Sequence, residues 1–390
     1  MPSVRGAFYM LSPHRVDLKQ RQWTQALPSI KPYYAVKCNP DPKLLNLLRQ
    51  YAFGFDCASP RELSLMNNYR DDVHDSIIYA NPCKSDRDIE YAKQRGSPLT
   101  VVDSAEEIDK LDMYQYTGGA LIRIKVDDTG SKMPFSSKFG LSPESVVTLG
   151  EYAKKKGIQL RGISFHVGSS SNNSNAHPNA IELALKGCNQ LLGLGHKADI
   201  VDIGGGFVPS DSFDQTAAKI RWKLIEKRAG VTFIAEPGRF FATESQDLFV
   251  QVIGKKPGAG GWRYTVDESL YGQFTNILFD HQKPRWIRIP RESDRERPTG
   301  KGILFGRTCD SLDVIAKSDL MEELDVGDWL WFPNMGAYTT VTASEFNGFP
   351  KPPVFLDEEG LLPDVKNINM SKSVGKIQYI EAVSAKNMLG

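Results

Sequence analysis

The sequence predicts an α/β protein: a (β/α)8 barrel with a second, mostly antiparallel β domain. Between residues 31 and 242, short β-rich runs alternate with capped helical runs, as they do in a barrel. After residue 244, strand-like runs follow one another with few helices between them. An open doubly wound sheet also alternates. The barrel is favoured because polar groups gather at the carboxyl ends of the strands, where barrel enzymes hold their active sites.

The composition is that of an ordinary globular protein. The chain has 390 residues, 41% of them hydrophobic and 24% charged, with a formal net charge of +1. Charge near zero gives no reason to expect nucleic acid or an anionic membrane as a partner. No apolar run reaches the ~18 residues of a membrane span, and residues 1–15 lack the apolar segment of a signal peptide. Five cysteines without a CxxC pair argue against zinc and disulfides. We therefore expect a cytoplasmic protein.

The predicted barrel occupies residues 13–244. Its eight candidate strands are 33–37, 54–58, 77–80, 99–103, 121–126, 162–168, 200–204 and 232–236. Asp41, Ser59 and Ser142 each precede a proline, which is typical of a helix start. Ser59 and Ser104, each with a glutamate three residues later, also form capping boxes. Eight such repeats predict a closed barrel.

The second predicted domain consists of residues 245–390 together with 1–12. Its candidate strands are 248–253, 262–266, 274–279, 302–305 and 329–332. The N-terminal segment 7–12 is expected to complete the sheet. After residue 353 the periodicity is weak, which predicts a partly disordered tail.

Reactive groups follow the predicted barrel strands. They are Lys37, Asp56, Asn81, Asp103, Arg123, His166, Gly204–Gly206 and Glu236. A lysine such as Lys37, placed after apolar residues, is either a snorkelling surface residue or a desolvated amine with a lowered pKa that forms Schiff bases. Alone, Lys37 does not decide between them.

Two motifs follow the last two predicted strands. They are Gly204-Gly205-Gly206 and Glu236-Pro237-Gly238-Arg239. Glycine amides and an arginine fork suit an anion, and barrels commonly hold a phosphate in these two loops. A lone glycine triplet indicates only a tight turn, but the two motifs together favour a phosphate site. Glu236 can then pair with a ring nitrogen and keep it protonated.

The remaining candidates are His166, Cys309 and Asp310. No cluster at metal spacing accompanies His166, so we expect no metal, and its flat ring can cover a planar cofactor. By themselves, Cys309 and Asp310 indicate a packed thiol beside a turn aspartate. A Schiff-base lysine, a phosphate cradle, a carboxylate for a ring nitrogen and a flat cover are what pyridoxal 5′-phosphate requires.

At this level of detail the sequence resembles a known family. The motifs that carry the resemblance are PYYAVKCN (32–39), FDCAS (55–59), YANPCK (79–84), SFHVGS (164–169), DIGGGF (202–207), AEPGR (235–239), TCDSLD (308–313), NMGAYT (334–339) and FNGF (346–349). They occur in order from about residue 7 to residue 350. They resemble the eukaryotic-type ornithine decarboxylases, in the alanine-racemase-like group of pyridoxal-phosphate enzymes.

The resemblance implies a role for each matching cofactor residue. Lys37 would hold the cofactor as a Schiff base, Glu236 would bind the pyridine nitrogen, and His166 would stack on the ring. The residues that would bind the phosphate or otherwise contact the cofactor are Ser169, Gly205, Gly206, Gly238, Arg239 and Tyr338, with Asp56 and Arg123 lining the site.

The resemblance also implies a homodimer with shared active sites. Cys309 and Asp310 would come from the other subunit, and Cys309 would be the acid that protonates Cα. Asp280 and Asp310 would hold the substrate's terminal ammonium, with Phe346 packed beside it. In addition, Lys138 matches a position that pairs across the dimer with the position of Asp313.

The implied activity is decarboxylation of L-ornithine to putrescine and CO2, a step of polyamine biosynthesis. Arg307 replaces the proline usual before the TCD motif, and Phe279 replaces a tyrosine of the animal enzymes. We expect Arg307 to place a cation near the substrate end, where it would repel a distal ammonium or recruit an acidic group.

Several alternatives remain open. One is a decarboxylase of lysine, or of a modified amino acid in specialised metabolism. A non-catalytic regulator resembling antizyme inhibitor fits less well, because Lys37, Cys309 and Asp310 are present. A racemase would need a second base facing the lysine, and a diaminopimelate enzyme would need a cation for which Arg307 is the local candidate. An arginine enzyme is expected to have glutamate at position 280.

Overall fold

The computed structural model describes residues 6–66, 76–171, 173–225, 230–258, 260–291, 296–360 and 362. The chain divides into two compact units, Lys19–Phe241 and Met1–Leu18 with Ala242–Gly390. The domain boundaries predicted from the sequence were 12/13 and 244/245. No helix in these ranges is long and apolar enough to cross a membrane.

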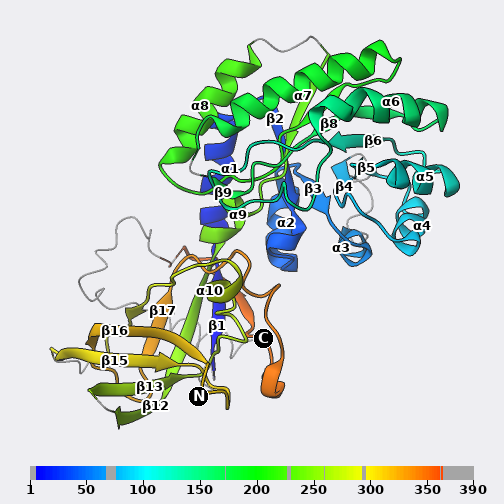
Figure 1. Ribbon diagram of the computed structural model, residues 1–390. Helices are drawn as coiled ribbons and strands as arrows, with labels where there is room; N and C mark the ends of the chain where they lie inside the picture. The colour runs from blue at the N-terminus through cyan, green and yellow to red at the C-terminus, as the bar shows by residue number, and fades with distance from the viewer. Residues whose placement is uncertain are drawn as a thin grey trace. The chain divides into compact units, whose positions relative to one another are not determined.

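The unit Lys19–Phe241 contains a closed barrel of eight parallel strands (Figure 1). In barrel order these are β10 (Ile200–Asp202), β11 (Thr232–Ala235), β2 (Ile30–Ala35), β3 (Gly54–Cys57), β4 (Ile77–Tyr79), β5 (Leu99–Val102), β6 (Ala120–Arg123) and β8 (Leu160–Ser164). The predicted fold class is therefore confirmed. The predicted strands extend too far at their carboxyl ends, because Lys37, His166 and Glu236 lie beyond the last paired residue of their strands.

Helices surround this barrel (Figure 1). They are α1 (Pro13–Ala26), α2 (Pro42–Gln50), α3 (Pro60–Leu65), α4 (Asp86–Gln94), α5 (Ala105–Met113), α6 (Val146–Lys155), α7 (Ala176–Gly193), α8 (Ser212–Leu224) and α9 (Arg239–Ala242). Asp41 caps α2 and Ser59 caps α3 as expected, by accepting a backbone N–H of the first turn. Ser142 caps nothing with its side chain and precedes a 3-10 turn, Pro143–Ser145, before α6 begins.

The capping box expected at Ser104 forms only in half. Ser104 Oγ accepts the backbone N–H of Glu107, at 3.4 Å. The Glu107 carboxylate is buried and instead forms ion pairs with Lys84, at 3.1 Å, and with Lys110. The Glu107 carboxylate therefore pairs with the buried Lys84, whereas in a complete capping box it would accept the backbone N–H of Ser104.

A cluster of buried aromatic side chains packs beside the start of α9, the helix that begins with Arg239. The Trp23 ring lies 5.1 Å from that of Phe207 and 5.6 Å from that of Phe240, and Phe213 packs on Phe240 at 4.3 Å. All four rings are buried. Because Phe240 follows Arg239 directly, this packing sets where α9 starts.

A short ribbon joins the loops after β6 and β8. Its strands are β7 (Ser131–Met133) and β9 (Ser169–Ser171), paired antiparallel. The Asp128 carboxylate accepts the backbone N–H groups of Phe135, at 2.5 Å, and Ser136, at 2.8 Å. The ribbon and these bonds together connect the segment that carries Phe135 to the segment that carries Ser169.

The other unit contains a mostly antiparallel sheet. Its elements are β1 (Phe8–Leu11), β12 (Gln246–Gly258), β13 (Gly261–Val266), α10 (Asn276–Phe279), β14 (Ile287–Arg288), β15 (Thr299–Phe305), β16 (Val314–Glu322), β17 (Trp329–Phe332) and β18 (Val354–Leu356). The strand order is β14-β17-β12-β13-β15-β16, with β1 pairing with β12 and β18. The predicted N-terminal strand therefore completes the sheet.

One expectation for this unit is wrong. Residues 274–279 form a turn and the short helix α10 instead of a strand, since the Phe279 N–H donates to Thr275 O, at 2.9 Å. A run of only six residues is too short for its apolar pattern to distinguish a helical turn from a strand. The predicted tail begins with β18, which pairs in parallel with β1. Residues 363–390 lie outside the described residues.

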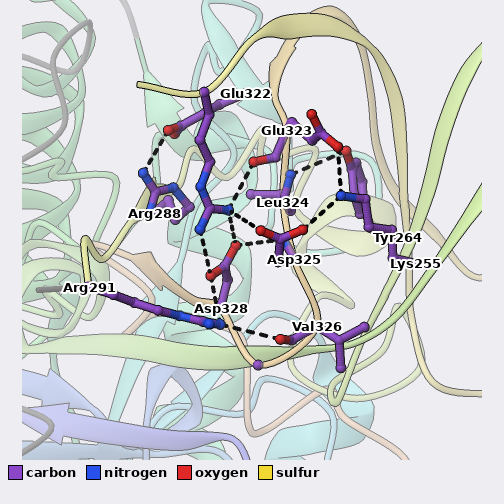
Figure 2. A network of polar contacts seen from close by, with 12 residues as sticks. Lys255, Tyr264, Arg288, Arg291, Glu322, Glu323, Leu324, Asp325, Val326 and Asp328 are labelled. Carbon is purple, nitrogen blue, oxygen red and sulfur yellow. Dashed lines mark hydrogen bonds and ion pairs between the residues drawn. The ribbon is translucent and has the colours of Figure 1, made fainter. Parts of the chain in front are cut away.

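A network of charged groups links the strands of this unit (Figure 2). Asp328 is fully buried, and its carboxylate forms ion pairs with Arg291, at 2.8 Å, and Arg297, at 2.5 Å. It also accepts the backbone N–H of Asp325, at 2.7 Å. At the edge of the network, Lys255 contacts Glu323 and Asp325, and Arg288 contacts Glu322.

Candidate active site

Lys37 lies just beyond the barrel strand β2, in a 3-10 turn, Val36–Cys38. Val36 and Cys38 are buried, whereas 42% of the Lys37 side chain is exposed. Its Nζ forms an ion pair with Oδ2 of Asp56, a fully buried residue of β3. The other oxygen, Oδ1, is buried without a hydrogen-bond partner in the described chain. Lys37 is thus an accessible amine held by a buried carboxylate, in contrast to the desolvated lysine considered from the sequence.

Two further buried acids lie at the ends of neighbouring strands. Asp202 ends β10, and Glu236 follows β11. Burial raises the pKa of both carboxyl groups, and the charge of Asp202 raises the pKa of Glu236 further. Asp202 Oδ1 accepts the Gly204 N–H, at 2.9 Å. Apart from a proton that the two acids can share, Glu236 Oε1 has no partner among the described residues.

The His166 ring lies on the same rim, beyond β8. Its Nδ1 accepts the Gly168 N–H, at 3.1 Å, so the ring's proton is on Nε2. Burial holds the pKa of His166 well below its usual range, and the charges of Arg123 and Lys37 lower it further. The ring of Phe135 meets the imidazole edge to face, 4.8 Å away. The structure therefore presents a neutral, flat imidazole at the barrel rim.

The glycine triplet follows β10 and comes close to His166. Gly204 and Gly206 have φ of +63° and +95°, a region that residues with a Cβ rarely adopt. A Cβ on Gly205 would lie 2.8 Å from His166 Nε2, so only glycine allows this approach. The His177 ring nitrogen Nε2 bonds the Gly205 carbonyl, at 3.1 Å, and fixes the loop.

Arg239 and Ser169 complete a cradle with this glycine loop. Arg239 begins α9, and its Nη2 donates to Ser169 Oγ, at 3.2 Å. A Cβ on Gly206 would lie 2.8 Å from the carbonyl of Gly168, the residue before Ser169. Gly238 packs on the lysine turn, since a Cβ there would lie 2.9 Å from that of Cys38. Backbone amides, a hydroxyl and a guanidinium together suit an anion.

Arg123 ends β6 and adds a further cation to the rim, in addition to Lys37 and Arg239. Its guanidinium lies 5.2 Å from the centre of the Phe139 ring. Burial lowers the pKa of Arg123, and the charges of Glu236 and Asp103 oppose that shift. Among the described residues, no group of three or more His, Cys, Asp or Glu side chains is arranged to hold a metal.

The rim fits pyridoxal 5′-phosphate. Glu236 Oε1 is a buried acceptor that a protonated ring nitrogen would satisfy. The neutral His166 ring offers a face for the pyridine, the 204–206 loop with Ser169 and Arg239 offers donors for the phosphate, and Lys37 offers an accessible amine. The chemistry of these groups matches the cofactor inferred from the sequence.

The predicted substrate residues lie in the other unit. Cys309 and Asp310 occupy the turn between β15 and β16, where Cys309 is exposed and its N–H donates to Asn347 Oδ1, at 3.1 Å. Asp310 accepts the Leu312 N–H, at 2.9 Å, and the hydroxyl of Tyr271. These bonds lower the pKa of Asp310. Thiol and carboxylate therefore belong to adjacent residues of one turn.

Phe346, Asp280 and Tyr338 lie in three further segments of this unit. The Phe346 ring packs on that of Tyr271, at 4.5 Å, which brings it to the Asp310 turn. Asp280 follows α10, is buried, and accepts from Gln282 Nε2, at 3.0 Å. Tyr338 has a φ of +54°, and its carbonyl accepts the Thr342 hydroxyl, at 3.0 Å.

Asp313 is engaged within its own turn. It is buried, and it accepts the N–H groups of Leu270, at 2.7 Å, and Thr308, at 3.0 Å, and the Thr308 hydroxyl, at 2.6 Å. Gly306 makes room for it, since a Cβ there would lie 2.2 Å from Asp313 Oδ1. Asp313 thus shapes the turn that carries Cys309. The pairing with Lys138 across a dimer stays a prediction.

Three residues of these sites received no role from the sequence: Asp202, His177 and Tyr271. The only available signal for Asp202 was its place before the glycines of the DIGGGF motif. His177 and Tyr271 act through a glycine carbonyl and an aspartate, respectively. A single sequence does not reveal such long-range contacts.

Comparison with known proteins agrees with this geometry. Residues 14–243 match the family described as "Pyridoxal-dependent decarboxylase, pyridoxal binding domain". The chain is 40% identical to the ornithine decarboxylase of Schizosaccharomyces pombe over 358 residues, 89% of this chain and 82% of that protein. It is also 36% identical to antizyme inhibitor 2 of Xenopus laevis over 369 residues, 90% of this chain and 80% of that protein.

Two solved structures of similar fold are decarboxylases. The arginine decarboxylase of Paramecium bursaria Chlorella virus, bound to agmatine, has a TM-score of 0.85 and 36% identity, covering 90% of this chain and 96% of its own. The lysine/ornithine decarboxylase of Vibrio vulnificus, complexed with putrescine, has a TM-score of 0.82 and 31% identity, covering 91% and 95%.

The chain belongs to the pyridoxal-dependent decarboxylase family. Within it, the chain is an amino-acid decarboxylase of the ornithine decarboxylase type, and its cofactor is pyridoxal 5′-phosphate.

Proposed function

We propose that this protein converts L-ornithine to putrescine and CO2. The observation that carries the proposal is the acidic turn of the β domain, where Asp310 stands beside Cys309 with a lowered pKa. Asp280 adds a second, buried carboxylate. Two aspartates suit the terminal ammonium of a diamine-type substrate. The aspartate at position 280 favours ornithine over arginine, for which the family resemblance implies a glutamate.

In the proposed mechanism, the barrel rim holds the cofactor. When bound, pyridoxal 5′-phosphate takes up the electron pair left by the departing carboxylate. Lys37 would supply the amine that carries the cofactor between turnovers, with Asp56 holding that amine in place. Glu236 would keep a proton on the ring nitrogen, and the neutral His166 ring would cover the ring face. Ser169, Gly206 and Arg239 would bind the phosphate.

We propose that Cys309 returns the proton to Cα after CO2 leaves. Its thiol is exposed on a turn whose backbone is fixed by Asn347, so it can approach a substrate without moving the turn. Asp310 and Asp280 would bind the distal ammonium, and Phe346 would pack beside the substrate's carbon chain. Tyr338 would add a donor to the phosphate.

The proposed assembly is a homodimer in which each β domain serves the barrel of the other subunit. A site shared in this way needs both subunits, so a monomer would be inactive. We also propose a cytoplasmic location, because all five cysteines are free of disulfides, as is usual for proteins of a reducing compartment. A purely regulatory role is less well supported, because the reactive side chains Lys37 and Cys309 are retained.

The substrate is tested by measuring CO2 release with mass-spectrometric product identification. Purified protein loaded with cofactor is offered ornithine, lysine, arginine and diaminopimelate separately. We expect putrescine from ornithine at the highest kcat/KM. Higher turnover of lysine or arginine would reassign the substrate, and a bound cofactor with no turnover of any of the four would favour a modified amino acid.

Shared sites are tested by mixing two inactive variants, Lys37→Ala and Cys309→Ala. After subunit exchange at a one-to-one ratio, half of the dimers are mixed, and each has one intact site. We therefore expect about a quarter of the wild-type activity to return. Each variant alone under the same exchange protocol is the control. No recovery despite demonstrated exchange would contradict sites built from two subunits.

A further inference from the structure

Arg307 is held by its own domain through three contacts. The carbon at the centre of its guanidinium lies 3.7 Å from the centre of the Phe349 ring. Its Nη1 donates to the Asp267 carbonyl, at 2.7 Å, and its backbone N–H donates to the Glu268 carbonyl, at 3.1 Å. The charged group is therefore engaged within its own unit, whereas the sequence suggested that it extends toward the substrate.

The contact with Phe349 anchors a short segment that contains Phe346. Within this segment, Asn347 and Gly348 have φ of +58° and +74°, and the Gly348 N–H donates to Glu345 O, at 2.8 Å. Such a tight left-handed turn has no ladder of backbone hydrogen bonds to hold it. Its position on the domain is fixed by the Ser344 N–H, which donates to Tyr271 O, at 2.9 Å, and by side-chain contacts.

The segment is attached to the Cys309 turn at two places. Arg307 stacks on Phe349. Two residues further along the turn, the Cys309 N–H donates to Oδ1 of Asn347, which lies two residues before Phe349. Phe346 then lies on Tyr271, whose hydroxyl binds Asp310. The thiol, the carboxylate and the aromatic ring form one connected group, and Arg307 holds one end of it.

We propose that Arg307 is a positioning residue that fixes Phe346 relative to Cys309 and Asp310. This inference rests on the proposed function, in which those three groups meet the substrate. A proline here would have neither the backbone N–H that binds Glu268 nor a side chain to stack on Phe349. This chain therefore replaces a stiff backbone with a side-chain clamp, and the distal charge of the substrate is not what Arg307 recognises.

The test compares Arg307→Ala, Arg307→Lys and Phe349→Leu with the wild-type holoenzyme. Loss of the stacked cation should raise KM for ornithine roughly tenfold with a smaller change in kcat, and should increase aberrant product. Amide hydrogen exchange at residues 344–350 should speed up in the same variants, while exchange in β12 stays unchanged. Lysine should recover only part of the effect, because it lacks the planar group that stacks.

A double variant separates a clamp from two unrelated effects. If Arg307 acts through Phe349, adding Arg307→Ala to Phe349→Leu should raise KM little further. Lys301→Ala, on the adjoining strand β15, is the matched control, since its partner Asp319 is 3.7 Å away and both side chains are mostly exposed. It should leave KM, product ratio and exchange unchanged.

Three results would overturn the proposal. The first is a lower KM for ornithine in Arg307→Ala, which would mean that the arginine repels the substrate. The second is full rescue by lysine, which would mean that charge alone matters. The third is unchanged KM and unchanged exchange at 344–350. If the enzyme prefers another amino acid, the kinetics are repeated with that substrate, while the exchange result needs none. Failure of the substrate assignment and failure of the clamp are thus read separately.

Discussion

Glu236 in the barrel and Asp328 in the β domain are both buried acids, but their surroundings differ. Asp328 forms ion pairs with Arg291 and Arg297 and accepts a backbone N–H (Figure 2). Glu236 lies among other acids, and its Oε1 accepts no bond from a described residue. One carboxylate is saturated by its own chain, whereas the other is incomplete.

The difference separates a structural charge from a functional one. A buried carboxyl without a partner costs on the order of 1–3 kcal/mol in folding free energy. A fold bears that cost where a ligand supplies the missing group, so the unsatisfied oxygen is consistent with the proposed place of the cofactor's ring nitrogen. Asp328 already has its cations and needs no ligand. Substitutions at the two sites should therefore affect different quantities.

The largest effect is expected from Lys37→Ala. Removing the amine should lower kcat by more than about a thousandfold, because covalent catalysis loses its nucleophile. The cofactor absorbance that depends on attachment to lysine should disappear, and the melting temperature should fall, because buried Asp56 loses its cation. Lys43→Ala, an exposed lysine of α2, is the control. Retention of the absorbance band in Lys37→Ala would refute the assignment of this residue.

Glu236→Gln and Asp328→Asn test the comparison directly. Glu236→Gln should lower kcat about a hundredfold, with little change in stability, since burial already raises the pKa of Glu236 and favours its uncharged form. Asp328→Asn should lower the free energy of unfolding by about 3 kcal/mol, because its arginines lose their counter-charge. Its kcat per folded molecule should stay near the wild-type value.

Urea unfolding and steady-state kinetics on the same preparations decide the matter. We expect Glu236→Gln to lose activity and keep its stability, and Asp328→Asn to lose stability and keep its activity. If both variants lose stability equally, the unsatisfied Glu236 oxygen is not a mark of function.

The barrel could be predicted from the sequence because its signals are local and repeated. Each strand is a short apolar run, and caps such as Asp41 and Ser59 mark the helices between them. The strand ends were placed too late for a physical reason. In 162–168, for example, pairing stops at Ser164, and His166 already belongs to the loop that serves the site.

What the sequence did not predict depends on contacts between distant segments. The run 274–279 fits a strand or a helical turn equally well, and tertiary packing chose the turn. Burial in the folded barrel raises the pKa of both Asp202 and Glu236, and the charge of Asp202, on the neighbouring strand, raises the pKa of Glu236 further. Arg307 was expected to affect the substrate, but Phe349, 42 positions later, engages its charged group. Local sequence patterns reveal neither the pairing of Asp202 with Glu236 nor that of Arg307 with Phe349.

His177 extends the comparison to pH. Burial lowers its pKa from 6.5 to about 4 in the folded protein. A base with a depressed folded pKa contributes stability above its unfolded pKa and loses it as pH falls. As pH falls from 6.5 to about 4, protonation linked to His177 should therefore lower the free energy of unfolding by about 3 kcal/mol.

Urea unfolding of wild type and His177→Gln across this pH range provides the measurement. Glutamine keeps an N–H for the Gly205 carbonyl but does not titrate, so the variant's stability should fall less steeply with acid. His14→Gln, at an exposed position of α1, should follow the wild-type curve. Parallel curves for wild type and His177→Gln would show that His177 does not carry the acid sensitivity.

The smallest effect is expected at the edge of the network of Figure 2. Lys255 contacts Glu323 and Asp325, but Asp325 is 53% exposed, so solvent and salt screen the pairs. Lys255→Gln should lower the free energy of unfolding by less than about 1 kcal/mol, and the difference should shrink in high salt. The loss from Asp328→Asn should persist in salt because that charge is buried. A salt-resistant loss at Lys255 would mean that burial does not divide this network into a structural centre and a solvated edge.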